Sequence, residues 1–357
     1  MDRATVDVYE QRSADYEAQR TPRFLPQATA LGARRPPGIA IDLGCGPGWY
    51  TAALGDPVVA LDAAGAMVRR TREVAPRSLA VRAELGALPL RRGALAAGWA
   101  RNTYVHLPQT DVPMAWNDLH HALQPDAPIE VTVFAGDAEG YELFPDDDLP
   151  GRWFSTWTEA RLRDVLHGAG FAIDELATAS RASDADFTIR AHRARTLPDF
   201  VGAEMRVLVS GLNPSVHAAD AGVGYVTPGN RFWPAAIEAG LATVDRDARH
   251  ALRHHGMGMT DVVKRATARA DELTTAEYRD GMARLERLCA WLQPGVMCFV
   301  GLAGWRAAVD RKAVAGWQPS TLGGRPVYVL PSTSGLNAAT PLSVLIDHLR
   351  EVARHGT

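Results

Sequence analysis

The chain has 357 residues, of which 46% are apolar and 22% are charged, and its formal net charge is −3. This is the composition of a soluble globular protein, and the length is sufficient for two domains with separate cores. No apolar run is long enough to cross a bilayer, and the N-terminus lacks the basic-then-apolar start of a signal peptide, so we expect neither a membrane span nor a signal peptide.

The three cysteines, Cys45, Cys289 and Cys298, form no pair with metal-binding spacing. A sparse and odd set is typical of a reducing cytoplasm, and we therefore expect no bound metal and a cytoplasmic location, associated with the nucleoid if the protein is bacterial. Acidic residues outnumber basic ones in residues 1–200, whereas basic residues outnumber acidic ones in residues 201–357. The net positive charge of residues 201–357 therefore favours a polyanionic binding partner.

The first distinctive stretch is a buried strand at Gly38–Leu43 that runs into the glycine-rich turn Gly44–Gly48, with a helix expected from Trp49. A strand, a glycine turn and a helix in succession allow backbone N–H groups to approach a nucleotide-like ligand closely. The next strand, Val58–Leu61, ends at Asp62, where a carboxylate can accept both hydroxyls of a ribose.

This stretch resembles the cofactor motif of class I S-adenosylmethionine-dependent methyltransferases. The resemblance extends over residues 1–195 and implies a Rossmann-like α/β fold that binds S-adenosylmethionine. The residues that it assigns to the cofactor in this chain are Asp42, Gly44, Gly46, Gly48, Asp62 and Glu84.

The methyl acceptor is left open by the sequence. Methylation of an exocyclic base amine would need a tetrad that Arg101–Tyr104 does not match, and no cysteine follows a proline, as cytosine C5 methylation requires. Two further departures from the family are Pro125–Pro128, in place of Pro-Gly-Gly, and Gly98-Trp99, in place of an acidic-aromatic pair. His106 is either a general base or a histidine packed at a strand end, and a regulatory domain without catalysis is an alternative.

A change of pattern near Arg193–Ala203 separates two predicted domains, residues 1–195 and 196–357. In the second domain, strands and helices alternate, which predicts a parallel sheet with its ligand loops at one edge. The expected strands are Val207–Ser210, Val296–Val300 and Val327–Leu330; the expected helices are residues 234–240, Arg246–His255, Glu277–Gln293, Gly304–Val309 and Leu342–Arg354; and Gly256–Asp261 is expected to be a turn.

Three motifs in this domain occur in the order and spacing of the mismatch-specific uracil/thymine-DNA glycosylase family, which the domain resembles. They are Gly211-Leu-Asn-Pro-Ser215, then Tyr225 with Gly229-Asn-Arg-Phe-Trp233, and finally Leu330-Pro-Ser-Thr-Ser-Gly-Leu-Asn337. The resemblance implies an α/β/α sandwich that removes a base from double-stranded DNA containing uracil or a mismatched base. An extruded base would enter a pocket formed by Leu212, Tyr225 and Asn230.

Asn213 is the predicted catalytic residue. An amide has no titrating lone pair near neutral pH, so it can hold the attacking water but cannot deprotonate it strongly. This favours a dissociative reaction with a good leaving group. Leu336 is the predicted wedge that fills the space of the flipped nucleotide, on a phosphate-contacting loop that also contains Ser332, Ser334, Gly335 and Asn337.

Two departures bear on specificity, because Ala338 replaces an arginine that often follows the wedge and Ser215 replaces the glycine after Asn-Pro. No lysine lies in a recognised Schiff-base motif, so we expect a monofunctional glycosylase, without β-lyase activity, that needs no cofactor and is a monomer. The first alternative is a small-molecule or RNA methyltransferase whose C-terminal half only delivers it to nucleic acid. The second is a DNA-damage binding module without enzymatic activity.

Overall fold

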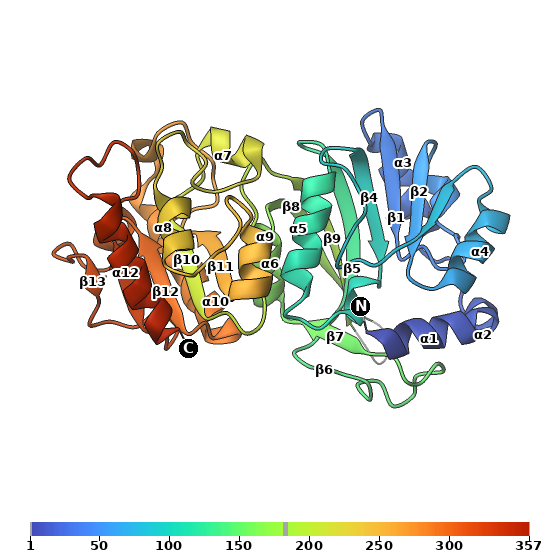
Figure 1. The fold of residues 1–357 in the computed structure, drawn as a ribbon. Helices are drawn as coiled ribbons and strands as arrows, with labels where there is room; N and C mark the ends of the chain where they lie inside the picture. Colours follow the sequence, from blue (N-terminus) through green and yellow to red (C-terminus); the bar gives the residue numbers. More distant parts are fainter. Residues whose placement is uncertain (1, 181–184, 357) are drawn as a thin grey trace. The chain divides into compact units, whose positions relative to one another are not determined.

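The computed structural model describes residues 2–180 and 185–356 (Figure 1). The chain divides into two compact units, the first made of Met1–His167 and Phe171–Ala194, and the second of Gly168–Gly170 and Arg195–Thr357. Both units mix helices and strands, so the α/β fold class predicted from the sequence is confirmed. No helix within the described ranges combines the length and the apolarity needed to cross a membrane.

The N-terminal unit is built on parallel strands in the order β3-β2-β1-β4-β5. β9 pairs antiparallel with β5, and β8 pairs antiparallel with β9. The strands are β1 (Ile39–Leu43), β2 (Val58–Asp62), β3 (Leu79–Arg82), β4 (Leu95–Arg101), β5 (Pro128–Ala135), β8 (Phe171–Ser180) and β9 (Ala185–Arg193). Two short strands, β6 (Glu139–Gly140) and β7 (Phe154–Trp157), continue from the end of β5. Because β1 lies at the centre, the loop after it opens at the carboxyl edge of the sheet, where α/β folds bind ligands.

The helices of this unit are α1 (Arg3–Gln11), α2 (Ser13–Gln19), α3 (Leu25–Arg34), α4 (Gly65–Val74), α5 (Val112–Ala122) and α6 (Glu159–Gly168), with short 3-10 turns η1 (Thr51–Leu54) and η2 (Tyr104–His106). The helix expected from Trp49 was wrong, because only the four residues of η1 are helical. Gly55, at φ +79°, ends this turn before Asp56-Pro57, so the chain has no room for a longer helix.

The C-terminal unit is a sheet in the order β11-β10-β12-β14-β13, parallel except for β13. Its strands are β10 (Val207–Gly211), β11 (Met257–Asp261), β12 (Val296–Val300), β13 (Gly316–Trp317) and β14 (Val327–Leu330). The turn expected at Gly256–Asp261 was wrong, because residues 257–261 form β11 beside β10. Met257-Gly-Met-Thr-Asp261 has little β-branched character, and its pairing with β10 decides its conformation.

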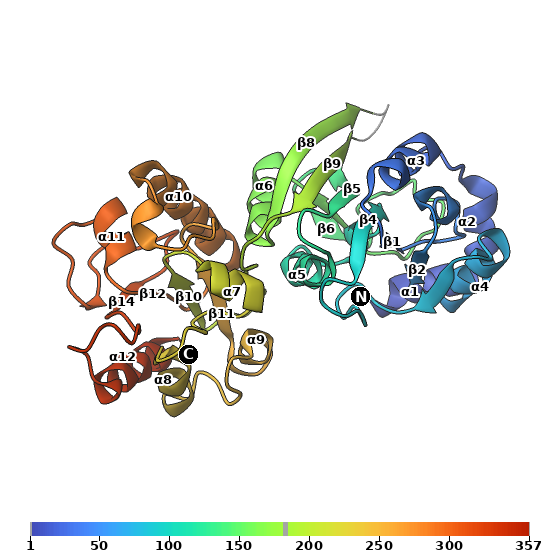
Figure 2. The same ribbon diagram turned by 90° about the horizontal axis from the view of Figure 1, so that it is seen from above.

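Helices cover both faces of this sheet, as Figure 2 shows. One core contains Val207 and Val209 of β10, and the other contains Leu208, so successive side chains of the strand enter opposite cores. The helices are α8 (Phe232–Glu238), α9 (Ala248–His255) and α12 (Leu342–His355) on the first side, α10 (Thr275–Leu292) and α11 (Ala303–Ala308) on the second, and α7 (Val216–Ala221) after β10, with the 3-10 turn η3 (Ala270–Glu272). The unit is therefore an α/β/α sandwich.

Candidate functional sites

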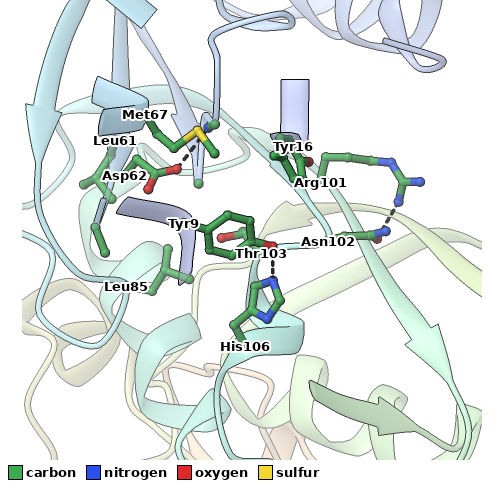
Figure 3. A pocket seen from close by; sticks show the side chains of 13 residues that line it. Tyr9, Tyr16, Leu61, Asp62, Met67, Leu85, Arg101, Asn102, Thr103 and His106 are labelled. Carbon is green, nitrogen blue, oxygen red and sulfur yellow. Dashed lines mark hydrogen bonds between the residues drawn. The ribbon is translucent and has the colours of Figure 1, made fainter. Parts of the chain in front are cut away.

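A pocket in the N-terminal unit lies where β1, β2 and β4 end (Figure 3). It encloses about 500 Å³ of empty space, part of which is open to solvent. The strand ends contribute Gly44, Gly46, Asp62 and Thr103, whereas Tyr9 and Tyr16 come from the N-terminal helices α1 and α2. The sequence motif and the N-terminal segment therefore meet around one cavity.

The glycines of the first loop are required by its backbone. Gly44 has φ +63°, and a Cβ there would collide with Oγ1 of Thr103. Gly46 has φ +52°, and its N–H donates to Oδ2 of Asp62 at 3.0 Å. Gly48, at φ +86°, packs on Thr71 and does not line the pocket. The loop thus presents bare backbone to the cavity at Gly44 and Gly46.

The three predicted carboxylates occupy different positions. Asp62 lines the pocket, and its Oδ1 accepts from the N–H of Ala64 at 2.9 Å; burial raises the pKa of this carboxyl to about 6. Asp42 is buried but does not line the pocket, and its carboxylate accepts a hydrogen bond from Oγ1 of Thr51 at 2.6 Å. Glu84 is exposed, and its neighbour Leu85 lines the cavity instead. Of the three, only Asp62 lines this pocket.

A hydrogen-bonded chain of side chains forms another part of the wall. Nδ1 of His106 lies 2.7 Å from the carbonyl oxygen of Trp153, which can only accept, so Nδ1 carries the proton. Nε2 therefore accepts from the hydroxyl of Tyr9 at 2.8 Å, and Arg152 donates to the same hydroxyl at 2.7 Å. Burial lowers the pKa of His106 to about 4, so this histidine is neutral and is a weak base.

In the C-terminal unit the predicted residues lie on loops at the carboxyl edge of the sheet. Asn213 follows β10 and the Pro331–Asn337 loop follows β14, and both strands run parallel to β12, which lies between them. The side chain of Leu212 lies beside Gly304, just beyond the loop that follows β12. The parallel register therefore brings the first and third motifs to the same edge of one sheet.

The amide of Asn213 has a fixed orientation. Its Nδ2 donates to Oγ1 of Thr267 at 2.8 Å, to the carbonyl oxygen of Arg265 at 3.0 Å and to that of Pro214 at 3.2 Å. Two of these acceptors are carbonyl oxygens, so the nitrogen and oxygen of the amide cannot be exchanged. The side-chain oxygen of Asn213 has no partner within residues 2–180 and 185–356, and the side chain is half-buried.

The second motif joins an aromatic pair to a helix start. The ring of Tyr225 stacks on that of Phe232 at 4.1 Å between centroids, and its hydroxyl is buried without a hydrogen-bond partner in the described chain. Oδ1 of Asn230 accepts from the N–H of Phe232 at 2.9 Å, so this side chain forms a local turn just before α8. Such a bond holds the loop locally, which is the alternative to a base-edge contact for Asn230.

The loop that carries the predicted wedge, Pro331–Asn337, is called the wedge loop below. It is held by Arg231, to which the sequence motifs give no function. The guanidinium of Arg231 donates to the carbonyl oxygens of Ser334 at 2.9 Å, Asn337 at 2.8 Å and Thr340. Nδ2 of Asn337 closes the loop by donating to the carbonyl oxygen of Ser332 at 2.9 Å. Arg231 follows Asn230 directly, so the second motif fixes the third.

The tip of this loop projects from the molecule. Leu336 is 96% exposed, and Gly335 beside it lies against Gly229, whose carbonyl oxygen would be 3.0 Å from an added Cβ. The hydroxyl oxygens of Ser332 and Ser334 accept backbone N–H bonds at 3.3 Å from Ser334 and Leu336 respectively. A hydroxyl that accepts still has its own proton to donate, which suits contact with a phosphate.

Comparison with known families identifies both units. Residues 198–350 match the family model described as uracil DNA glycosylase superfamily, and residues 40–126 match that described as methyltransferase domain. The chain joins a methyltransferase domain to a uracil DNA glycosylase superfamily domain. The predicted resemblance of the first half to methyltransferases and of the second half to uracil DNA glycosylases is therefore confirmed at the level of these two families. The glycosylase superfamily match contains every residue predicted for base excision, from Leu212 to Asn337.

Solved structures similar to the chain include several methyltransferases. A 1,6-didemethyltoxoflavin-N1-methyltransferase from Burkholderia thailandensis is 20% identical, with 54% of this chain and 88% of that chain covered and a TM-score of 0.42. An S-adenosylmethionine-dependent methyltransferase from Methanosarcina mazei is 14% identical, covering 44% and 92%, with a TM-score of 0.40. One from Aquifex aeolicus is 15% identical, covering 50% and 97%, also with a TM-score of 0.40.

The pocket of the methyltransferase domain fits the cofactor that this fold implies. Gly46 leaves space that a side chain would fill, Gly44 lets Thr103 pack directly against the loop, and Asp62 presents a carboxylate whose oxygens each keep a free lone pair. Leu61, Met67 and Leu85 supply apolar surface. Among the described residues, no group of three or more histidine, cysteine or acidic side chains has the arrangement of a metal site.

Proposed function

We propose that the glycosylase superfamily domain is a monofunctional DNA glycosylase that excises uracil, and mismatched thymine or modified pyrimidines more slowly, from double-stranded DNA in base excision repair. The observation that supports this most strongly is the oriented amide of Asn213, with its nitrogen held by three acceptors and its oxygen unpartnered in the described chain. An oxygen presented in this way can hold one water in a fixed position.

The reaction is hydrolysis of the N-glycosidic bond. The water oxygen bonds to C1′ of the sugar, the C1′–N1 bond breaks, and its electron pair leaves with the base. Asn213 orients the water but does not deprotonate it, so the water loses its proton only as the oxocarbenium-like sugar is captured, and this proton passes through solvent to the departing base anion. Uracil leaves more readily as an anion than an undamaged base does, and this difference protects normal DNA.

The loop of the third motif also supports this function. Leu336 extends from a loop whose backbone is fixed by Arg231, so an apolar side chain is available to enter the duplex without a large ordering cost. Ser332 and Ser334 can donate to phosphates beside it. A fixed loop with an exposed apolar tip is what extrusion of a nucleotide requires.

The test is a strand-cleavage assay with the full chain on duplexes that contain uracil or thymine opposite guanine. We expect an abasic product from the uracil duplex and a loss of roughly 100-fold or more for Asn213→Ala, comparable to the removal of a positioned polar group from other active sites. DNA binding and the thermal unfolding midpoint of the variant should be unchanged. Retarded but uncut DNA would favour the binding-module alternative, and substantial activity of the variant would remove Asn213 from its role.

We also propose that the pocket of the methyltransferase domain binds S-adenosylmethionine, which supplies an electrophilic methyl group when bound. Gly44 and Gly46 would lie against the cofactor, and Asp62 would accept from its ribose hydroxyls. Burial keeps His106 neutral and makes it a weak base, and its hydrogen bonds with Tyr9 and Trp153 fix the orientation of the ring, so an acceptor that is already nucleophilic fits the pocket better than one that must be deprotonated. Calorimetric titration with S-adenosylhomocysteine tests cofactor binding without knowledge of the acceptor.

A further inference from the structure

Lys264 is a buried lysine to which none of the three motifs gives a function. It lies three residues after the end of β11, in a stretch outside the helices and strands of the unit. The residue is 3% exposed. Lysine is almost never buried to this extent unless its ammonium group is paired, because an isolated charge is costly to remove from water. The partners of Lys264 therefore show why it is buried.

The ammonium group of Lys264 is bound to the first residues of the C-terminal unit. Nζ donates to Oδ1 of Asp199 at 2.7 Å and to the carbonyl oxygen of Leu197. The carbonyl oxygen of Lys264 accepts from Oγ1 of Thr196. Thr196 and Asp199 are both buried, so these bonds lie in the interior. The side chain and the backbone of Lys264 are thus both held by residues 196–199.

Asp199 is itself fixed from another side. Its Oδ1 also accepts from Oγ1 of Thr260, on β11, at 2.7 Å, and its Oδ2 accepts from Nη1 of Arg284, on α10, at 2.8 Å. Burial raises the pKa of Asp199, but the positive charges of Arg284 and Lys264 outweigh burial and lower the pKa overall. The carboxylate is therefore ionised, and its bonds to both cations are charge-assisted.

The stretch that contains Asp199 is also paired with the sheet. An isolated antiparallel bridge joins Phe200 to Met259 of β11, and the N–H of each residue donates to the carbonyl oxygen of the other at 2.8 Å. Residues 196–199 therefore lead into a backbone that a strand holds in place, and they can act as a fixed support for Lys264.

The residues that follow Lys264 hold the amide of Asn213. The carbonyl oxygen of Arg265 accepts from Nδ2 of Asn213 at 3.0 Å, and Oγ1 of Thr267 accepts from the same nitrogen at 2.8 Å. Arg265 also forms an ion pair with Glu277, but this pair is exposed to solvent, where ion pairs contribute little. The interior bonds of Lys264 therefore constrain this stretch more strongly than the exposed pair does.

We propose that Thr196 and Lys264 are positioning residues for excision, because they fix the stretch whose acceptors set the direction of the Asn213 amide. The inference rests on the proposed glycosylase function and adds two residues to the same site. Both are buried, so they act through Asn213 rather than by contact with DNA. A network that only stabilised the fold would loosen the whole unit when weakened, whereas a positioning network should loosen the amide of Asn213 first.

The test follows this amide directly, by NMR of the full chain with isotopically labelled asparagine. The asparagines of the chain are Asn102, Asn117, Asn213, Asn230 and Asn337. The signal that is missing from Asn213→Ala is that of Asn213, and the exchange of its Nδ2 protons with water is measured. Asn337 is an internal control, because its Nδ2 is also hydrogen-bonded, to the carbonyl oxygen of Ser332 and to Oγ1 of Thr340. Uracil excision and DNA affinity are measured on the same proteins.

Two variants weaken the constraint to different extents. Thr196→Val keeps the shape of the side chain and removes one hydrogen bond, so the Asn213 amide should exchange about fivefold faster and excision should slow about fivefold. Lys264→Met removes bonds made by a charged group, and both effects should reach about tenfold or more. The affinity for a uracil duplex should not change. Thr243→Val, which removes an exposed hydrogen bond to His255 in the same unit, should behave as wild type.

The inference is overturned if the amide of Asn213 exchanges at the wild-type rate in Thr196→Val. It is also overturned if the amide of Asn337 accelerates equally, or if excision and DNA affinity fall together, because either result would show a general loosening of the unit. If circular dichroism shows that Lys264→Met is unfolded, Thr196→Val decides alone. Faster exchange at Asn213 in a chain whose wild type cuts no DNA would refute the proposed glycosylase and leave the control of this amide by Thr196 and Lys264 standing.

Discussion

The side-chain nitrogen of Asn213 lies 2.8 Å from the hydroxyl oxygen of Thr267, a residue 54 positions later in the chain. Thr267 also binds the first motif through its backbone, because its N–H donates to the carbonyl oxygen of Pro214 at 3.2 Å and its carbonyl oxygen accepts from Val216. It is 4% exposed. The segment after β11 therefore sets the direction in which the amide of Asn213 points.

Replacing Thr267 by valine should slow uracil excision by about fivefold, because one hydrogen bond of about 1 kcal/mol no longer orients the amide. The shape of the side chain is kept, so the affinity for DNA should not change. Single-turnover cleavage measures the excision rate, and titration with DNA measures the affinity. An equal loss of binding would show that Thr267 supports the fold rather than the orientation of Asn213.

The second prediction concerns the clamp on the wedge loop. Arg231→Ala removes three bonds to carbonyl oxygens of residues 334–340, so we expect faster proteolysis within that loop and excision slowed by roughly tenfold. Arg350→Ala, an exposed arginine on α12, is the matched control and should behave as wild type. Unchanged protease resistance in Arg231→Ala would contradict the role of the clamp.

The third prediction separates the wedge from the fold. Leu336→Ala should leave the free energy of unfolding within about 0.5 kcal/mol of wild type, because the side chain is 96% exposed. Excision from a duplex should nevertheless slow by about tenfold, whereas excision from single-stranded DNA should not change. Val314→Ala, at another exposed aliphatic residue of the unit, serves as the control. Equal rates for both variants on duplex DNA would exclude Leu336 as the wedge.

The fourth prediction uses two glycines of the methyltransferase domain with nearly equal φ angles. Gly44 has φ +63° and Gly93 has φ +64°, but a Cβ would collide with Thr103 only at Gly44 and would meet nothing within 4 Å at Gly93. Gly44→Ala should weaken S-adenosylhomocysteine binding by at least about tenfold. Gly93→Ala places a side chain at a similar positive φ and should keep wild-type affinity, so calorimetry on the pair separates the collision with Thr103 from the effect of the positive φ. Similar losses in both would attribute the effect to backbone strain alone.

The fifth prediction is a dependence of stability on pH. The pKa of Asp261 is raised by folding, to about 7, so the folded state binds the proton more tightly than the unfolded state does. This contribution is fully present below the unfolded pKa of about 4 and is lost as the pH rises through 7. Chemical denaturation should show that Asp261→Asn is more stable than wild type at about pH 8, with a smaller difference at about pH 5. If the stability advantage of Asp261→Asn over wild type grew as the pH fell, the predicted direction of the pH dependence would be wrong.

Much of the fold followed from local sequence. The apolar runs at Val207–Ser210 and Val327–Leu330 are strands, and the glycine turn after Leu43 opens the pocket, because β-branched runs and glycine turns express their preferences over a few residues. Residues 257–261 were not recognised as a strand, because they acquire that conformation only by pairing with β10. The same pairing places Asp261 beside Gly211.

By itself, the sequence determined that two α/β domains are present and which motifs belong to each, since these depend on residue types at short spacing. Only the tertiary structure decided that Arg231 holds the wedge loop, that Thr267 orients Asn213 and that Tyr9 reaches His106. Each of these contacts joins segments more than 50 residues apart. Such pairs come into contact because parallel strands bring their carboxyl ends to one edge of the sheet and helices pack over that edge. A local sequence pattern does not predict which distant residue will lie there.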